Sequence, residues 1–297
     1  MSISKYDRVS FRTALVFGTL LAFYGNVYGG QYIRVSPDLD IYYEDAGTGT
    51  PIIFIPGWIG TSVVFKAQIS HFAQNYRTIA YDPRSVGRSS KTLDNNNYTQ
   101  HGADLKAFID ALTLKDVVLV GHSLGCRDAY SYFRTYGAAN VRAFVCIDHP
   151  PRTFIEREGD WGDHIFPDSV KAVNDGLNYD RLNFTRELIN GMVSRPLTEA
   201  EINEFVDELM KAPTHAAIAL WLDGNISDYR QEAQLIDGKI PVLYVLSEQK
   251  GYTEAARAWL TENLPNTRIE AFGLHLMFWE FPDRFNAVVD DFLRNIE

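Results

Sequence analysis

The stretch Asp116-Val-Val-Leu-Val-Gly-His-Ser-Leu-Gly125 decides the fold, because an apolar run leads directly into a Gly-x-Ser-x-Gly pattern that a helical pattern follows. In this order of strand, turn and helix, the serine occupies a sharp, strained turn that holds its hydroxyl clear of the sheet. Side chains two positions before and after the serine would collide there, which accounts for Gly121 and Gly125. The stretch therefore predicts an α/β protein in which Ser123 is the nucleophile.

Strand-like and helix-like stretches alternate on both sides of this turn, which is typical of a mostly parallel sheet with helices on both faces. The strand-like runs are 32–36, 39–45, 51–56, 76–82, 116–120, 141–148, 240–246 and 267–272, and the helical patterns lie near 99–113, 124–136, 253–263 and 278–294. The first two runs alternate in polarity and look like an antiparallel start. The sequence therefore predicts an eight-stranded, mostly parallel sheet.

One connection is much longer than a crossover helix requires. About ninety residues separate Asp148 from Ile240, and the pattern Thr198-Glu-Ala-Glu201 within them is a helix-capping signal. We expect an inserted helical cap over 151–212. The core then comprises 30–150 and 213–297, including a return helix near 214–224.

The first 29 residues differ from the rest and predict a signal peptide. Lys5, Arg8 and Arg12 precede an apolar run over 13–24, and small residues follow at Gly25 and Gly29. The apolar run is short for a stable membrane span, so we expect a secreted or periplasmic protein. An uncleaved N-terminal anchor is the alternative.

Composition and charge restrict the function classes. The chain has 297 residues, of which 46% are hydrophobic, and its formal net charge is -10, which argues against nucleic-acid binding. Cys126 and Cys146 lie in apolar surroundings and predict buried free thiols, although an oxidising compartment would permit a bridge. No metal-ligand spacing is present. We therefore expect a small-molecule substrate and neither a metal nor a cofactor.

A serine nucleophile needs a base, and His275 is the favoured one of seven histidines. It follows the last strand in the loop Gly273-Leu-His-Leu-Met, and such loops gather at the carboxyl edge of a parallel sheet. His122 lies within the turn, with its side chain expected to point away from the serine. The remaining histidines are interpreted as solvent-facing, namely His71, His101 and His164, or as possible pocket residues, namely His149 and His215.

Three stretches together resemble the α/β-hydrolase family, namely Gly121-His-Ser-Leu-Gly125, Asp82-Pro-Arg-Ser-Val-Gly-Arg-Ser89 and Gly273-Leu-His-Leu-Met-Phe-Trp-Glu-Phe-Pro-Asp-Arg-Phe285. The resemblance covers the chain after the leader except the cap, and it implies a serine esterase or lactonase with a catalytic triad. Three positions depart from the family pattern. Pro56-Gly57 replaces the usual His-Gly, Ser85 replaces a glycine, and Lys250 aligns with the family's common acid.

The third member of the triad is therefore open between two carboxylates. Asp148 ends the sixth strand-like run, and Glu248 follows the seventh. Subfamilies that resemble haloalkane dehalogenases and fungal lactonases place their acid after the sixth strand, so Asp148 is favoured and Glu248 is the runner-up. A hinge residue ahead of the cap is the alternative role for Asp148.

Two backbone amides are expected to form the oxyanion hole, those of Leu124 and of Trp58 in the loop Pro56-Gly-Trp-Ile-Gly60. The substrate pocket is expected to include Trp58, His122 and His149. Aromatic residues of the cap region, namely Trp161, Phe166 and Trp221, are further candidates for enclosing a substrate.

These residues predict a hydrolase that cleaves a small carboxylic ester or lactone through an acyl-enzyme intermediate. Dehalogenase and epoxide hydrolase chemistry is disfavoured, because those enzymes attack with a carboxylate and position 123 is serine. The alternatives are a non-catalytic small-molecule-binding homologue, or a carbon–carbon bond hydrolase or perhydrolase that uses the same triad.

Overall fold

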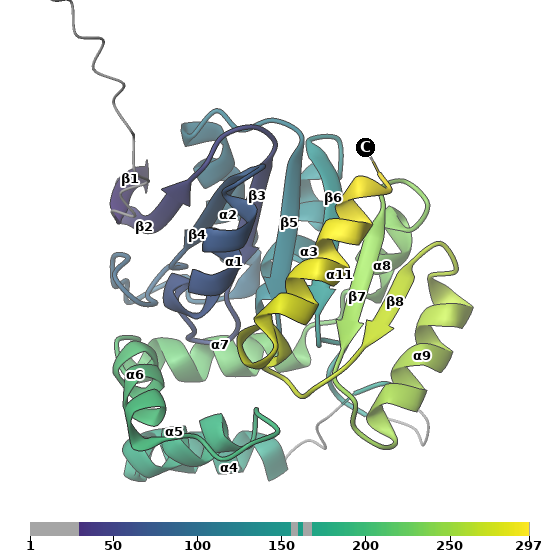
Figure 1. Cartoon of the computed structure of the whole chain (residues 1–297). Helices are drawn as coiled ribbons and strands as arrows, with labels where there is room; N and C mark the ends of the chain where they lie inside the picture. The colour runs from purple at the N-terminus through teal and green to yellow at the C-terminus, as the bar shows by residue number, and fades with distance from the viewer. Residues whose placement is uncertain (1–29, 156–159, 163–167, 297) are drawn as a thin grey trace, which may run out of the picture.

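An eight-stranded sheet forms the centre of the computed structural model, which describes residues 30–155, 160–162 and 168–296 (Figure 1). The strand order is β1-β2-β4-β3-β5-β6-β7-β8; β2 pairs antiparallel with β1 and β4, and the other neighbours are parallel. The strands are β1 Gln31–Ser36, β2 Leu39–Ala46, β3 Pro51–Ile55, β4 Arg77–Tyr81, β5 Val117–His122, β6 Val141–Ile147, β7 Val242–Leu246 and β8 Arg268–Ala271. The predicted eight-stranded, mostly parallel sheet is confirmed.

Helices cover both faces of this sheet, and an apolar core lies between the sheet and the helices on each face. Side chains of α1 and α11 pack on one face, and side chains of α2, α3, α8 and α9 pack on the other. The helical segments are η1 Ser62–Phe65, α1 Lys66–Phe72, α2 Tyr98–Ala111, α3 Gly125–Tyr136, α4 Asp168–Tyr179, α5 Arg181–Asn190, α6 Glu199–Leu209, α7 Thr214–Ile226, α8 Arg230–Ile236, α9 Tyr252–Asn263, α10 Met277–Glu280 and α11 Pro282–Arg294. Among the residues described, no helix is both long and apolar enough to cross a membrane.

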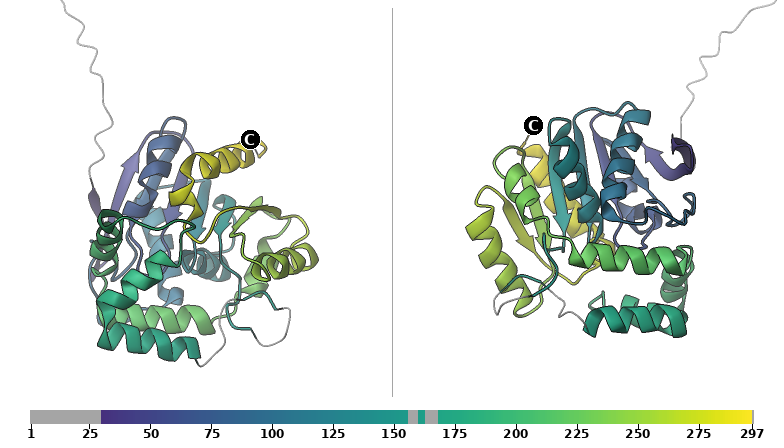
Figure 2. Two further views of the ribbon diagram at one scale, coloured as in Figure 1. Left: turned by 60° about the horizontal axis from the view of Figure 1, so that its bottom comes forward. Right: turned by 180° about the vertical axis from the view of Figure 1, so that it is seen from behind.

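The helices α4, α5, α6 and α7 gather at the end of the sheet where β5 and β6 finish (Figures 1 and 2). The capping pattern predicted for α6 is present, since the Thr198 amide donates to Glu201 Oε2 at 2.8 Å and Glu201 N donates to the Thr198 hydroxyl. The first of the two apolar cores continues into these helices, because it includes Val173, Ile189 and Phe205. The predicted cap boundaries, 151–212, stay a prediction, and the predicted leader, 1–29, lies outside the described residues, as do His164 and Phe166.

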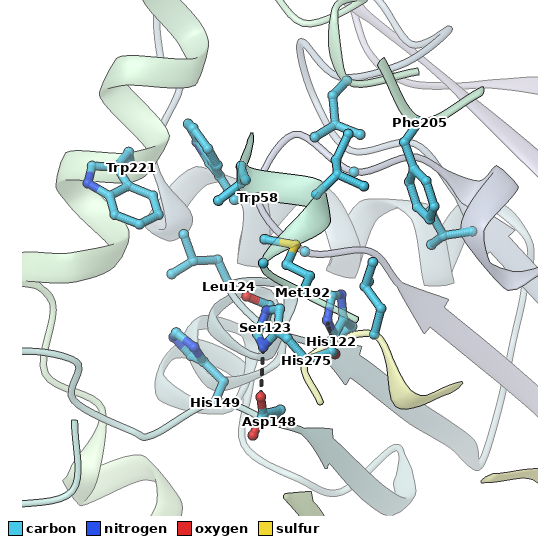
Figure 3. A pocket seen from close by; sticks show the side chains of 18 of the residues that line it. Trp58, His122, Ser123, Leu124, Asp148, His149, Met192, Phe205, Trp221 and His275 are labelled. Carbon is cyan, nitrogen blue, oxygen red and sulfur yellow. Dashed lines mark hydrogen bonds and ion pairs between the residues drawn. The ribbon is translucent and has the colours of Figure 1, made fainter. Parts of the chain in front are cut away.

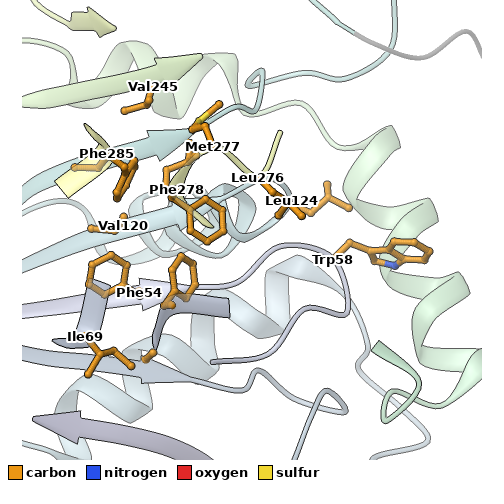
Figure 4. Close-up of a cluster of buried hydrophobic side chains, with 14 of the residues drawn as sticks. Phe54, Trp58, Ile69, Val120, Leu124, Val245, Leu276, Met277, Phe278 and Phe285 are labelled. Atoms are coloured by element: carbon orange, nitrogen blue, oxygen red, sulfur yellow. The ribbon is translucent and has the colours of Figure 1, made fainter. Parts of the chain in front are cut away.

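The same core supports the loops at the carboxyl edge of the sheet (Figure 4). Phe54, Val120 and Phe278 are completely buried, and Leu124 and Trp58 lie to one side of them in the same cluster. Burial of each such side chain contributes roughly 1.5–3 kcal/mol. The loops that carry the candidate site are therefore held on a well-packed base.

One predicted helix is divided in two. The pattern over 278–294 suggested a continuous helix, but α10 ends at Glu280 and α11 begins at Pro282. Proline lacks the N–H that would continue the hydrogen-bond ladder and its ring clashes with the preceding turn. It instead takes the first position of the new helix, where no N–H is needed.

Candidate active site

Ser123 stands at the turn between β5 and α3, in a left-handed backbone conformation with φ of +51°. This conformation is strained for a residue that is not glycine. The Ser123 amide donates to the Ile147 carbonyl at 2.8 Å, which fixes the turn against β6. A Cβ at Gly125 would lie 2.4 Å from the Pro56 oxygen, and one at Gly121 would lie 2.9 Å from the Cys126 backbone. The two glycines thus meet the steric requirement deduced from the sequence.

His275 and Asp148 form a hydrogen-bonded pair next to this turn (Figure 3). His275 Nδ1 lies 2.7 Å from Asp148 Oδ2, and the second carboxylate oxygen accepts the Ser247 amide at 2.8 Å. Asp148 is buried, and its φ of +51° places it in the same strained region as Ser123. Two partners therefore hold the carboxylate, and the carboxylate in turn orients the imidazole.

Glu248 does not take part in this arrangement. Its backbone amide donates to the Gly273 carbonyl at 2.8 Å, but its side chain is exposed and does not line the pocket that holds Ser123. The geometry favours Asp148 as the residue that orients His275. The runner-up, Glu248, instead helps through its backbone to position the loop that carries His275.

The loop after β3 lies tightly against the serine turn. A Cβ on Gly57 would approach Ser123 Cβ to 2.9 Å and His122 Nδ1 to 3.0 Å. Ile59, two residues further on, has a φ of +48°. Among the described residues, the backbone amides of Trp58 and Leu124 donate to no protein group. The assignment of these two amides to an oxyanion hole stays a prediction.

The Trp58 side chain attaches this loop to helix α7. Its indole Nε1 donates to the Ala217 carbonyl of α7 at 2.8 Å, and its ring lies 4.9 Å from that of Trp221. Trp58 also lines the pocket, so it combines an expected oxyanion donor with a wall of the cavity.

The His122 side chain contacts His275. Its Nε2 lies 3.1 Å from the His275 carbonyl, and its ring packs on those of His275 and Phe278. Burial, together with the charge of His275, lowers the pKa of His122 well below its usual value. The ring is therefore neutral, and Nε2 must carry the proton that it donates to the carbonyl. His122 also lines the cavity that holds Ser123.

The cavity above these residues has a volume of about 270 Å³ and is mainly apolar (Figure 3). Ser123, His275 and Asp148 lie at one end of it, whereas Trp58, Trp221 and Phe205 lie at the other. His149, buried beside Asp148, also lines it. Helices α5 and α6 supply a large part of the apolar lining, namely Leu188, Ile189, Phe205 and Leu209. The other aliphatic and sulfur-containing side chains of the lining are Val64, Leu124, Met192 and Leu276.

Of the three aromatic residues expected to enclose a substrate, one lines the cavity. Trp221 lines the cavity, whereas Trp161 packs against Tyr244 and Trp259 and does not reach it. Phe166 lies outside the described residues. Asn225 and Gln249 add polar atoms to the lining, and the sequence reasoning missed both. Asn225 follows Trp221 by one helical turn, which is the signal that could have found it.

The Asp82–Ser89 loop explains one departure from the family pattern. Ser85 adopts a φ of +62°, the conformation for which glycine is usual, and its hydroxyl accepts the Thr92 amide at 3.0 Å. Asp82 accepts the amides of Ser62 and Arg88 at 2.7 and 2.8 Å. A serine thus fills the glycine position here, and a local hydrogen bond helps to hold the strained turn.

No group of three metal-binding side chains occurs within the described ranges. The polar side chains of the pocket include Ser123, His275 and Asp148, the residue types that nucleophilic acyl transfer requires.

The chain belongs to the α/β-hydrolase fold family, whose model matches residues 50–282. It is 24% identical over 244 residues to the non-heme chloroperoxidase CPO-A1 of Kitasatospora aureofaciens, an alignment that covers 79% of this chain and 87% of that protein. Two solved structures are similar to it, and each alignment covers 90% of this chain and 100% of the other at 24% identity. They are a bromoperoxidase from Bacillus anthracis, with a TM-score of 0.83, and an esterase from Exiguobacterium antarcticum, with a TM-score of 0.79.

Proposed function

We propose that this hydrolase cleaves small carboxylic esters or lactones through an acyl-enzyme intermediate. Ser123 is the nucleophile, His275 the general base and Asp148 the acid that orients it. The observation that carries the proposal is the 2.7 Å hydrogen bond between His275 Nδ1 and Asp148 Oδ2. It lies at the end of the pocket where Ser123 is located.

The hydrogen bond between His275 and Asp148 determines which nitrogen of His275 takes part in the proton transfers. Because Asp148 engages Nδ1, the free Nε2 of His275 accepts the Ser123 proton as Oγ attacks the substrate carbonyl. The amides of Trp58 and Leu124 stabilise the oxyanion that develops. His275 then gives the proton to the departing alkoxide, and a water molecule repeats the sequence on the acyl-enzyme. With a lactone, the alkoxide stays attached to the acyl group.

The size and lining of the cavity support a compact, partly apolar substrate. A volume of about 270 Å³ lies just below the usual range for small-molecule pockets, which begins at about 300 Å³. The apolar side chains Phe205, Leu209 and Met192 offer no partner for a charged acyl chain. Short to medium acyl groups should therefore react fastest.

Hydrolysis of p-nitrophenyl esters from acetate to octanoate tests the proposal. The wild-type protein should turn over the shorter members, and Ser123→Ala should reduce kcat by roughly 10⁶-fold, because the residues of a triad act as a unit. Fluorophosphonate labelling should occur on the wild type alone. Folded protein that shows neither turnover nor labelling would favour the non-catalytic binding homologue. Unchanged turnover by Ser123→Ala would exclude Ser123 as the nucleophile.

Perhydrolysis is a second candidate, supported by the likeness to a non-heme chloroperoxidase. Hydrogen peroxide would replace water in attacking the acyl-enzyme and release a peracid. Peracid formation from acetate and peroxide, monitored by monochlorodimedone halogenation in the presence of bromide, tests it. The activity should disappear in Ser123→Ala; peroxide-dependent halogenation that survives this substitution would exclude the shared mechanism.

A further inference from the structure

Two cysteines lie directly beneath the Ser123 turn and touch each other. Cys126 belongs to the first turn of α3, and Cys146 lies on β6 beside Gly121 of β5. Their Sγ atoms are 2.7 Å apart, and both side chains are completely buried. Even carbon atoms that merely pack against each other stand about 3.5–4.0 Å apart. The fold therefore brings these two thiols unusually close.

We infer that Cys126 and Cys146 form a disulfide bond when the chain folds under oxidising conditions. Both are free thiols in the described structure. They are the only cysteines of the chain, and no other intrachain disulfide competes with this one.

The bond would join the two halves of the candidate site. Cys126 Sγ donates to the Gly121 carbonyl at 3.2 Å, two residues before Ser123. Cys146 Sγ lies 3.4 Å from the His149 carbonyl, one residue after Asp148. Without a disulfide, the segments around Ser123 and Asp148 are connected by hydrogen bonds such as the one from the Ser123 amide to the Ile147 carbonyl. A disulfide would add a covalent link directly below them.

The reaction needs an oxidant, for which a small-molecule disulfide such as oxidised glutathione suffices. The thiolate of one cysteine attacks that disulfide, which forms a mixed disulfide and releases one thiolate. The second cysteine, as a thiolate, then attacks the mixed disulfide and releases the second. Two protein thiols are oxidised, one external disulfide is reduced to two thiols, and the two protein protons pass to the released thiolates.

Burial determines when this exchange can occur. The thiolate is the reactive form, and burial together with the neighbouring Cys146 raises the pKa of Cys126 well above its usual value. The folded dithiol is therefore inert, and the folded disulfide is equally inaccessible to reductants. The redox state is set while the chain folds and persists until it unfolds.

Refolding the full chain with and without glutathione redox buffer tests the inference. After denaturation in iodoacetamide, protein refolded with oxidised and reduced glutathione should be two hydrogens lighter than the reduced chain. It should also carry no alkyl adduct unless it is first treated with a reductant. Protein refolded in reductant alone should carry two adducts. Two adducts after oxidative refolding, or one cysteine capped by glutathione, would overturn the inference.

Thermal unfolding provides an independent check. The oxidised form should melt roughly 5–10 °C above the reduced form, because the bond closes a loop of moderate length in the unfolded chain. Cys146→Ala should melt at the same temperature after either refolding, which makes it the matched control. Equal melting temperatures for the oxidised and the reduced wild type would overturn the expectation that the bond stabilises the folded chain. If the variant does not fold, the wild-type masses still decide whether the bond forms.

Discussion

His275 Nδ1 and Asp148 Oδ2 lie 2.7 Å apart although 127 residues separate them in the sequence. Asp148 directly follows β6, and its amide donates to the Val245 carbonyl of the neighbouring β7 at 2.8 Å. The parallel pairing of the strands thus places the Asp148 carboxylate next to the loop that follows β8 and carries His275. The pair depends on sheet geometry rather than on nearness along the chain.

Replacing Asp148 should impair catalysis far more than replacing Glu248. In Asp148→Asn, the amide cannot accept both from Ser247 N–H and from His275 Nδ1–H, so the imidazole loses its orientation or tautomer. We expect kcat to fall by roughly 10⁴-fold. Glu248→Gln, whose side chain is exposed, should stay within about twofold of the wild type. Steady-state kinetics on a p-nitrophenyl ester measure both, and equal losses would exclude Asp148 as the orienting acid.

Gly57→Ala should slow turnover without unfolding the protein. The added methyl would lie 2.9 Å from Ser123 Cβ and 3.0 Å from His122 Nδ1, so the serine turn or the oxyanion loop must shift. A displacement of that kind reduces kcat by about 10²-fold. Gly137→Ala is the control, because that Cβ meets no atom within 4 Å. It is strained by a φ of +69° and should reduce stability but not kcat. Wild-type kcat in Gly57→Ala would contradict the close approach.

His122 should destabilise the protein as the solution becomes acidic. Burial lowers its folded-state pKa well below its usual value, whereas in the unfolded chain it titrates near 6.5. Below about pH 6.5 the unfolded state therefore binds the extra proton, and the free energy of unfolding falls by at most about 1.4 kcal/mol per pH unit. Urea unfolding of the wild type and His122→Asn between pH 5 and 8 should show a difference that shrinks as the pH falls. A constant difference would mean that His122 does not titrate in this way.

His101 should make the folded protein less stable as the pH rises, which is the opposite of the effect expected for His122. The sequence suggested a solvent-facing residue, but His101 is buried, and its Nδ1 lies 3.3 Å from Asp128 Oδ1. Burial alone would lower its pKa, but the charge and hydrogen bond of Asp128, with a contribution from Asp104, leave that pKa raised. The stabilisation is therefore complete below about pH 6.5 and is lost as the pH rises through the raised folded-state pKa. His101→Gln should lack this loss in the same urea series. A wild-type advantage that does not decline with rising pH would contradict the pairing.

The sequence predicted what depends on local pattern and missed what depends on distant contacts. All eight strands were expected because apolar runs or runs of alternating polarity, bounded by turn residues, mark them. The seven-residue helices Lys66–Phe72 and Arg230–Ile236 were not expected, since so short a segment shows little periodicity. The burial of His101 was missed because Asp128, its partner, lies on another helix. In the pocket, helical spacing shows that Phe205 and Leu209 share a face but not that this face looks onto Ser123.

The origin of the pocket lining has an evolutionary consequence. The groups proposed for bond breaking come from loops at the sheet edge, whereas much of the apolar wall comes from α5, α6 and α7. If the cavity binds the substrate as proposed, substitutions at Leu188 or Phe205 should change which molecules are accepted while leaving the Asp148–His275 hydrogen bond intact. Lineages that descend from such a chain are free to acquire new substrates by drift in one segment, without rebuilding the reaction that another segment performs.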